Sequence, residues 1–403
     1  VLSFLITICP WHIMQSRWGL DCNLLPSFIM ISVYSILTAK KNWHYIIAGL
    51  FWGLSLYTYA LSYIMLPVFF IVLCSYLLYV KKITIKQIII TIIPIFILAI
   101  PLIMLQIVNY CGKGTMKLGI FTIPQLFKYR ISEIGLNNIT YNLNIAKNNN
   151  FFQLLFSADH NPGNSLKEYG TIYYALIPFS IFGFILILKE SIKTIKSKEF
   201  NLKTVFLIQF FTISLCVLIF SDLQLYKLNP LFIMLLAFAT EAIIWIYDKK
   251  KILGQLIVVS FSIIFIIFEI FYFKNINEKV GVGFNTDVIP LVSYLEQKYP
   301  DKEIFMETDA IQQYIYVILA TKMSPYDFLN IMQIIQYENG DTEVVKAGRY
   351  HFLHYVENKN MIYVLEENNL FRGQVVEIIK QDLESKGFSC EKYNNFLIYT
   401  YTE

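Results

Sequence analysis

The amino-acid sequence predicts an α-helical protein that crosses a membrane several times and ends in a small α/β domain. Hydrophobic residues make up 56% of the 403 residues, charged residues only 15%, and the mean hydropathy is +0.53. This composition is typical of a chain that lies mostly in lipid. Long apolar runs stop near residue 273, so we expect a membrane domain over residues 1–273 and an α/β domain over residues 274–403.

Eight apolar runs are candidates for membrane-spanning helices, which need about 17 to 25 residues each. They occupy residues 24–37, 43–60, 63–80, 87–108, 171–188, 205–220, 230–247 and 252–273. Residues 1–9 form a shorter apolar run that resembles the end of a helix. Because the chain opens on Val inside this run, we expect it to be truncated at its N-terminus.

The remaining segments carry weaker patterns. In the connection over residues 109–170, apolar and polar residues alternate around residues 121–127 and 151–156, which favours helices lying on the membrane. For the C-terminal domain we expect helices over residues 287–299, 324–336 and 371–386, and strands over residues 303–307, 350–354, 361–365 and 396–401. Glu241 lies inside an apolar run, so we expect it to face the bundle interior.

Lysines predict the orientation of the chain in the cell membrane, because short cytoplasmic loops hold an excess of Lys and Arg. One set of alternate connections carries thirteen lysines, whereas the short loops of the other set carry only Arg17 and Lys227. This asymmetry predicts that the segment around Arg17, the connection over residues 109–170 and the C-terminal domain are extracytoplasmic.

Arg17 and Asp21 are opposite charges four residues apart at the mouth of an apolar segment. An Arg or Asp near the centre of a membrane helix costs roughly 2.5 to 3.5 kcal/mol, so such a pair is expected to line an aqueous cavity or bind a charged group. The spacing predicts that both side chains lie on one face of a helix. The alternative is an ion pair that only ends a helix, worth roughly 0 to 1 kcal/mol.

Three blocks of sequence together resemble the core of GT-C glycosyltransferases, in particular the bacterial relatives of protein O-mannosyltransferases and of the lipid A aminoarabinose transferase. The blocks are Pro10-Trp11-His12 with residues 16–21 (SRWGLD), residues 49–59 (GLFWGLSLYTY) and residues 170–173 (GTIY). The resemblance covers about residues 1–247. It implies a GT-C-like bundle that transfers a hexosyl or pentosyl group from a polyprenyl-phosphate carrier to an extracytoplasmic glycan, lipid or protein.

The resemblance also implies roles for single residues. Asp21 matches the second acidic position of the family, where it would shape the sugar and acceptor pocket, and Arg17 would face the carrier phosphate. Lys227 and Asn229 stand where the family has an Arg-Leu/Met-Asn type sequence, so the cation there would be a point charge and not a planar fork. The family's main catalytic carboxylate would precede Val1, so we expect the chain alone to be inactive.

Three further residues are candidates for substrate contact. Tyr59 could belong to an aromatic wall for the sugar, although tyrosines at helix ends more often form an interfacial belt. His12 and His160 could contact the acceptor, and His160 beside Asp159 could hold a divalent metal, but a solvated loop is the simpler interpretation. The six cysteines show no C-x-x-C spacing, so we expect neither a zinc site nor disulfides, and no organic cofactor is indicated.

Other classes of function are either excluded or left open. A net charge of +4 with scattered basic residues does not suggest nucleic-acid binding. A transporter or flippase for a lipid-linked glycan remains an alternative, since its cavity would also need Arg and Asp, although the chain shows no internal repeat. The C-terminal domain could instead be a module that presents the acceptor.

The lysine asymmetry makes a direct prediction about topology. In a cysteine-free background, a cysteine at Ser197 should react with an impermeant thiol reagent only from the cytoplasm, and one at Asn358 only from outside. The opposite labelling pattern would overturn the predicted side for every candidate site residue.

Overall fold

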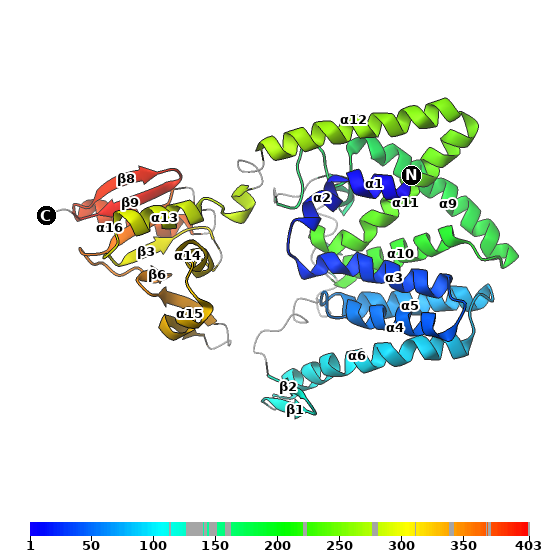
Figure 1. Ribbon diagram of the computed structural model, residues 1–403, viewed down its shortest axis with the longest axis horizontal. Helices are drawn as coiled ribbons and strands as arrows, with labels where there is room; N and C mark the ends of the chain where they lie inside the picture. Colours follow the sequence, from blue (N-terminus) through cyan, green and yellow to red (C-terminus); the bar gives the residue numbers. More distant parts are fainter. Residues whose placement is uncertain are drawn as a thin grey trace. The chain divides into compact units, whose positions relative to one another are not determined.

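The computed structural model divides the chain into two compact units, Val1–Lys274 and Asn275–Glu403. The structure describes residues 1–112, 114–125, 140, 143–144, 151–157, 163–220, 224–275, 281–310, 312–337, 342–367, 369 and 372–401. The N-terminal unit is a bundle of helices, and the C-terminal unit is a mixed β-sheet with helices on both faces (Figure 1).

The N-terminal unit consists almost entirely of helices. In order, its elements are α1 (Leu2–Ile8), α2 (Pro10–Ser16), η1 (Asp21–Leu24), α3 (Leu25–Leu37), α4 (Asn42–Ser55), α5 (Ser62–Tyr79), α6 (Ile85–Cys111), β1 (Met116–Leu118), β2 (Phe121–Ile123), α8 (Phe151–Phe156), η3 (Tyr174–Leu176), α9 (Ile177–Ser197), α10 (Leu202–Phe220), η4 (Leu225–Leu228), α11 (Asn229–Lys249) and α12 (Lys251–Asn275).

Within the described residues, six helical segments are long and apolar enough to cross a membrane: α5, α6, α9 with η3, α10, α11 with η4, and α12. This confirms the prediction of a polytopic membrane protein. Two of the eight predicted spans, the runs at residues 24–37 and 43–60, form shorter helices: α3, which together with η1 covers Asp21–Leu37, and α4, which has 14 residues. Both fall short of the roughly 20 residues that a spanning helix needs.

Small residues allow the helices of the bundle to approach closely. A Cβ atom at Gly183 of α9 would lie 1.7 Å from the carbonyl oxygen of Phe238 in α11, and one at Gly49 of α4 would lie 2.2 Å from that of Thr91 in α6. Any larger side chain would push these helix pairs apart. Close backbone approach at Gly is typical of helix pairs packed in membranes.

An ion-pair cluster joins three helices near the lysine-rich end of the bundle. The Lys203 ammonium at the start of α10 donates to Glu190 of α9 at 2.7 Å and to Glu241 of α11 at 2.6 Å. Only 21% of the Glu241 side chain is exposed, as expected for a charge that faces the bundle interior.

The C-terminal unit is built on a seven-stranded sheet. Its elements are η6 (Gly281–Phe284), α13 (Val288–Lys298), β3 (Ile304–Glu307), α14 (Tyr314–Thr321), α15 (Pro325–Ile331), β4 (Met332–Gln336), β5 (Thr342–Ala347), β6 (Tyr350–Phe352), β7 (Ile362–Glu366), α16 (Gly373–Ser385), β8 (Ser389–Tyr393) and β9 (Phe396–Thr400). The strand order is β4-β5-β6-β3-β7-β9-β8. β3 pairs in parallel with β6 and β7, and all other pairs are antiparallel.

Alternate residues of the central strands build two separate cores. Ile304 and Met306 of β3 pack against α13 and α14, whereas Phe305 between them packs against α16. The strands β7 and β9 alternate in the same way, because successive side chains of a strand point to opposite faces. A sheet covered on both faces needs such continuous apolar strands.

Several sequence-based expectations for single elements are wrong. Residues 324–336 are not one helix, since α15 passes directly into β4 at Met332, and residues 121–123 form a strand paired with β1 and not a helix. The strands β5 and β8 and the helix α14 were not predicted. Four of the five β8 residues are exposed, so β8 lacks an apolar alternation that would reveal it.

A buried carboxylate ends the central strand β3. The Glu307 side chain is only 1% exposed, and one guanidinium nitrogen of Arg372, just before α16, donates to both of its oxygens at 3.1 and 2.9 Å. Burial raises the pKa of Glu307 to about 7, although the neighbouring Arg372 charge acts in the opposite direction.

This shift predicts that the C-terminal unit loses stability as the pH rises. A carboxyl group with a higher pKa in the folded state contributes stability that is present below its unfolded pKa, 4.5, and is lost as the pH rises through about 7. The expected loss is roughly 3 kcal/mol, at 1.36 kcal/mol per pKa unit.

Hydrogen exchange of the β3 and β7 amides in the full chain, corrected for intrinsic rates, should therefore show greater protection at pH 5 than at pH 8. Glu307→Gln should abolish this difference, whereas Glu377→Gln, at a mostly exposed carboxylate of α16, should leave it. Equal protection at both pH values in the unmodified chain would contradict the prediction.

Candidate functional site

Most of the predicted site residues gather at the end of the bundle opposite the lysine-rich loops. This end collects the C-terminus of α2, η1, the N-terminus of α5, η4 and the start of α11 (Figure 1). The prediction that Arg17 and Asp21 share one helical face is wrong. α2 ends at Ser16, the backbone of Leu20 is extended, and Asp21 opens η1, so the two residues belong to different elements.

Arg17 is exposed and held by aromatic rings of α12. Its guanidinium carbon lies 5.4 Å from the ring centre of Tyr272 and 5.3 Å from that of Phe273. A guanidinium stacked on rings keeps its N–H groups available around its edge. The Asp21 carboxylate is also exposed, and one of its oxygens accepts a hydrogen bond from the Cys22 amide at 2.9 Å.

Asn229 lies at the centre of a buried group of polar side chains that we call the amide cluster: Trp11, Asn23 and Asn229. Trp11 Nε1 donates to Asn229 Oδ1 at 2.9 Å, and Asn229 Nδ2 donates to Asn23 Oδ1 at 2.8 Å. Asn23 Nδ2 in turn donates to the carbonyl oxygens of Gln15 and Trp18, at 2.7 and 2.8 Å. The cluster therefore fixes the turn that carries Arg17 against the start of α11.

Gln15 extends this polar region toward the segment before α9. It is 3% exposed, and its Nε2 donates to Asn164 Oδ1 at 3.4 Å. Its Oε1 has no hydrogen-bond partner within the described part of the chain. Sequence reasoning did not single out Gln15, Asn23 or Asn164, because a neutral amide gives no charge signal in a polar loop.

Lys227 is a buried cation beside an aromatic pair. It is 5% exposed in η4, and its Nζ lies 5.8 Å from the ring centre of Tyr226. The Tyr226 ring meets that of Tyr59 edge to face, with the centres 5.8 Å apart. The structure thus brings Tyr59 and Lys227, predicted separately, into contact with the same tyrosine.

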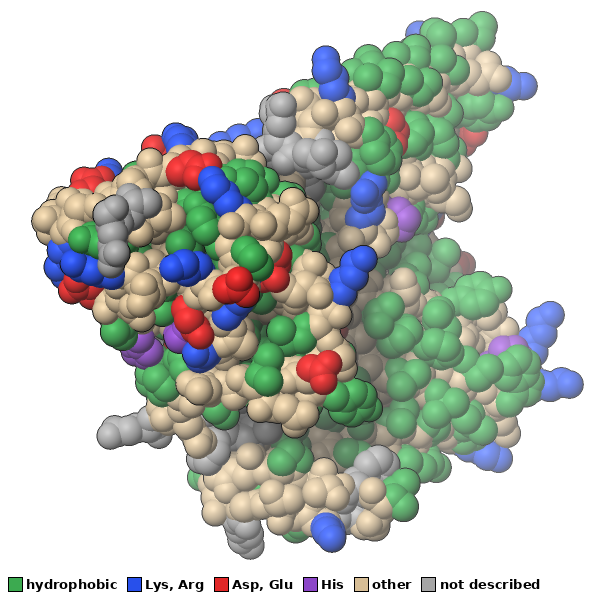
Figure 2. Space-filling view, turned by 60° about the vertical axis from the view of Figure 1, so that its left-hand side comes forward, with side chains coloured by type: hydrophobic (Ala, Val, Ile, Leu, Met, Phe, Trp, Pro, Cys, Tyr) green, Lys and Arg blue, Asp and Glu red, His purple; other side chains and the backbone are tan. Residues whose placement is uncertain are grey.

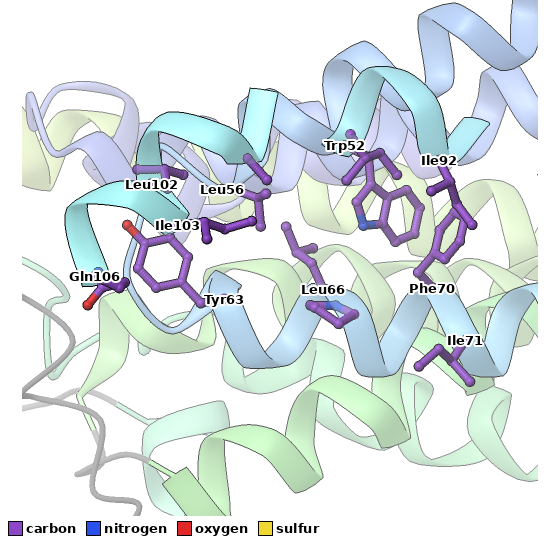
Figure 3. Close-up of a pocket in the computed structure, with 13 residues that line it drawn as sticks. Trp52, Leu56, Tyr63, Leu66, Phe70, Ile71, Ile92, Leu102, Ile103 and Gln106 are labelled. Atoms are coloured by element: carbon purple, nitrogen blue, oxygen red, sulfur yellow. The ribbon is translucent and has the colours of Figure 1, made fainter. Parts of the chain in front are cut away.

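An apolar groove of about 440 Å³ is lined by Tyr63, near the start of α5 and four residues after Tyr59 in the chain. Tyr63 and Gln106 lie at one end of this groove, and Phe70, Ile71 and Ile92 at the other (Figure 3). The remaining lining residues are almost all aliphatic and come from α4, α5 and α6. Ile71 and Ile92 are themselves well exposed, so the groove opens to the outside of the bundle.

The structure describes only one of the two histidines that were predicted to contact the acceptor. His12 is exposed on α2, with its ring 6.1 Å from that of Trp11. His160 lies outside the described residues. Among the described residues, no three His, Cys, Asp or Glu side chains are grouped so that they could hold a metal ion.

The amide cluster predicts a large cost for changing Asn229. Asn229→Leu leaves the buried Trp11 Nε1 without its acceptor, which costs about 1 to 3 kcal/mol, and removes the amide donor from the half-buried Asn23 Oδ1. We expect the free energy of unfolding in detergent to fall by about that amount or more, and Trp11→Phe combined with Asn229→Leu to cost less than the sum of the single variants.

Asn42→Leu, at an exposed position that begins α4, is the matched control and should change stability by less than about 0.5 kcal/mol. Equal stabilities of the Asn229 and Asn42 variants would show that the cluster does not hold the helices together.

Comparison with family models, curated protein sequences and solved structures finds no match to this chain. The resemblance to GT-C glycosyltransferases therefore stays a prediction from the sequence blocks. What the chain does has to be inferred from the arrangement of its own side chains.

Proposed function

We propose that the N-terminal unit binds a polyprenyl-phosphate-linked sugar and forms the carrier site of a glycosyltransferase that passes the sugar to an acceptor outside the cytoplasm. Two observations carry this proposal: the apolar groove, which Tyr63 lines, and the contacts of Tyr226 with Tyr59, four residues before Tyr63, and with the buried Lys227. An amphipathic lipid phosphate has the matching chemistry, with a long apolar tail that ends in an anion.

The groove suits the tail of such a carrier. Its walls are apolar, and it opens to the outside of the bundle through exposed isoleucines, so an isoprenoid chain could enter from the lipid phase. The polar side chains of Tyr63 and Gln106 lie at one end of the groove (Figure 3). Tyr63 follows Tyr59 by four residues in the chain. A carrier with its tail in the groove would therefore direct its phosphate toward the aromatic pair.

Two cations support binding of the phosphate and its departure from the sugar. Lys227 places a buried ammonium beside the Tyr226 ring, while the exposed Arg17 offers a planar fork of N–H donors. Preorganised positive charge stabilises the negative charge that builds on a leaving phosphate. The amide cluster holds the segments that carry both residues, so it would keep their geometry fixed during transfer.

Asp21 and Tyr59 would complete the pocket on the sugar side. An exposed carboxylate can accept hydrogen bonds from sugar hydroxyl groups, and a tyrosine ring gives a sugar an apolar face to stack on. The lysine asymmetry supports an extracytoplasmic position for this end of the bundle.

The proposal is tested by mixing the protein in detergent with a polyprenyl-phosphate sugar and an acceptor mixture. Binding of the carrier would support the proposal, and release of free polyprenyl phosphate would show in addition that this chain carries its own catalytic base, contrary to the expectation that it is inactive alone. Binding without release, together with movement of the carrier across a reconstituted bilayer, would favour the flippase alternative. Absence of carrier binding would reject both functions.

The role of Lys227 gives a more specific prediction. Lys227→Gln removes one charge-assisted contact, worth about 1.5 to 3 kcal/mol, so the Kd for polyprenyl phosphate should rise roughly ten- to a hundredfold. Lys227→Arg should retain most of the affinity. Lys249→Gln, at the opposite end of the same helix, is the control and should bind as the unmodified chain does. Unchanged affinity in a folded Lys227→Gln protein would remove Lys227 from the site.

A further inference from the structure

The C-terminal unit exposes an apolar surface that its own core does not use. Six hydrophobic side chains on α14, α15 and β4, which we call the apolar patch, are between 39% and 80% exposed. They are Ile315, Leu319, Tyr326, Leu329, Ile331 and Ile334. Residues 312–337 include only two charged side chains, Lys322 and Asp327.

The elements that carry the patch adjoin one another. The Tyr314 ring of α14 stacks on the Phe328 ring of α15, with the centres 5.3 Å apart. α15 continues directly into β4, which is the edge strand of the sheet. Met332 of β4 packs on the core that α14 and α15 cover, and Ile334, two residues later in the same strand, is 50% exposed.

The charge content of the patch contrasts with the rest of the unit. Figure 2 shows acidic and basic side chains intermixed on one face of the C-terminal unit. A soluble surface normally keeps such a mixture, whereas a cluster of exposed Leu, Ile and Tyr marks a place where another apolar phase makes contact.

A lipid bilayer is the apolar phase that this chain always has nearby. Twelve residues join Asn275, which ends the membrane-spanning helix α12, to Val288, which begins α13. Fully extended, they reach at most about 43 Å. This connection therefore keeps the C-terminal unit at a high effective concentration near the membrane surface. Because α12 already anchors the chain in the membrane, a small apolar patch suffices for a second contact.

The side chains of the patch fit the interfacial layer of a bilayer. Tyr326, the most exposed of the six, has the amphipathic ring that is enriched at the boundary between acyl chains and headgroups. Lys322, between α14 and α15, could meet lipid phosphates. We propose that the apolar patch inserts into the interfacial region of the bilayer and fixes the orientation of the C-terminal unit at the membrane.

Nitroxide labels on the full chain in phosphatidylcholine nanodiscs test this proposal. The exposed cysteines Cys111 and Cys390 are first replaced by Ser, and a label is placed at Tyr326→Cys, Leu329→Cys or Ile378→Cys. Ile378 is the matched control, because it is 67% exposed on α16, which covers the other face of the sheet.

The expected result is a severalfold higher ratio of collisions with oxygen to collisions with a water-soluble nickel chelate at positions 326 and 329 than at position 378. Leu329→Glu should abolish the difference for the label at position 326, whereas Val375→Glu on α16 should not. Both substituted side chains are exposed, so these variants should fold.

Three results would overturn the proposal. Equal access of the nickel chelate to all three positions would show that the patch faces water. Dipolar broadening between labels on two chains would show that a second copy covers it. Immobile labels that neither reagent reaches would show that the patch packs against protein.

Discussion

The side-chain amide of Asn229 is the interaction on which the candidate site depends. Its oxygen accepts from Trp11 and its nitrogen donates to Asn23, so both halves of the amide are used within the protein. Trp11 and Asn229 are buried, so water does not readily replace their hydrogen bond, and only one orientation of the amide satisfies both partners. Two segments far apart in the sequence, residues 11–23 and the start of α11, are thereby held in one arrangement, and Arg17 and Lys227 belong to the segments that are held.

The opposite end of the bundle is fastened by a different kind of contact. There, Lys203 ties Glu190 and Glu241 together, and each ion has a partner within hydrogen-bond distance. Between these two fastened ends the helices pack through apolar side chains and glycines. α6 packs on α4 through Gly49 and Gly53, and the apolar groove lies between it and α5. A lateral opening can therefore persist without loosening the rest of the bundle.

The sequence predicted structure well where apolar residues follow a regular pattern along the chain. It predicted poorly where a hydrogen-bond partner distant in the sequence determines the local conformation. Long apolar runs and lysine-rich loops predicted a polytopic membrane protein with the right helix order. The four-residue spacing of Arg17 and Asp21 failed as a helix signal, because Asn23 draws the chain into a turn by binding the carbonyl oxygens of Gln15 and Trp18. Lys227 and Asn229 were singled out through a resemblance, but the contact of Asn229 with Trp11 spans 218 positions and leaves no local trace.

The error at residues 324–336 has a physical cause that also explains the surface found there. The stretch is mostly apolar with a single charge, Asp327, and has no Gly or Pro after Pro325 to end a helix, so helix and strand patterns cannot be distinguished locally. Residues 332–336 become a strand because pairing with β5 at the edge of the sheet satisfies their backbone hydrogen-bonding groups. The same stretch has few charged side chains, so the surface that it forms in the folded protein also has few charges. Because an edge strand and a seven-residue helix cannot bury all of these side chains, the apolar surface is a direct consequence of the same sequence feature.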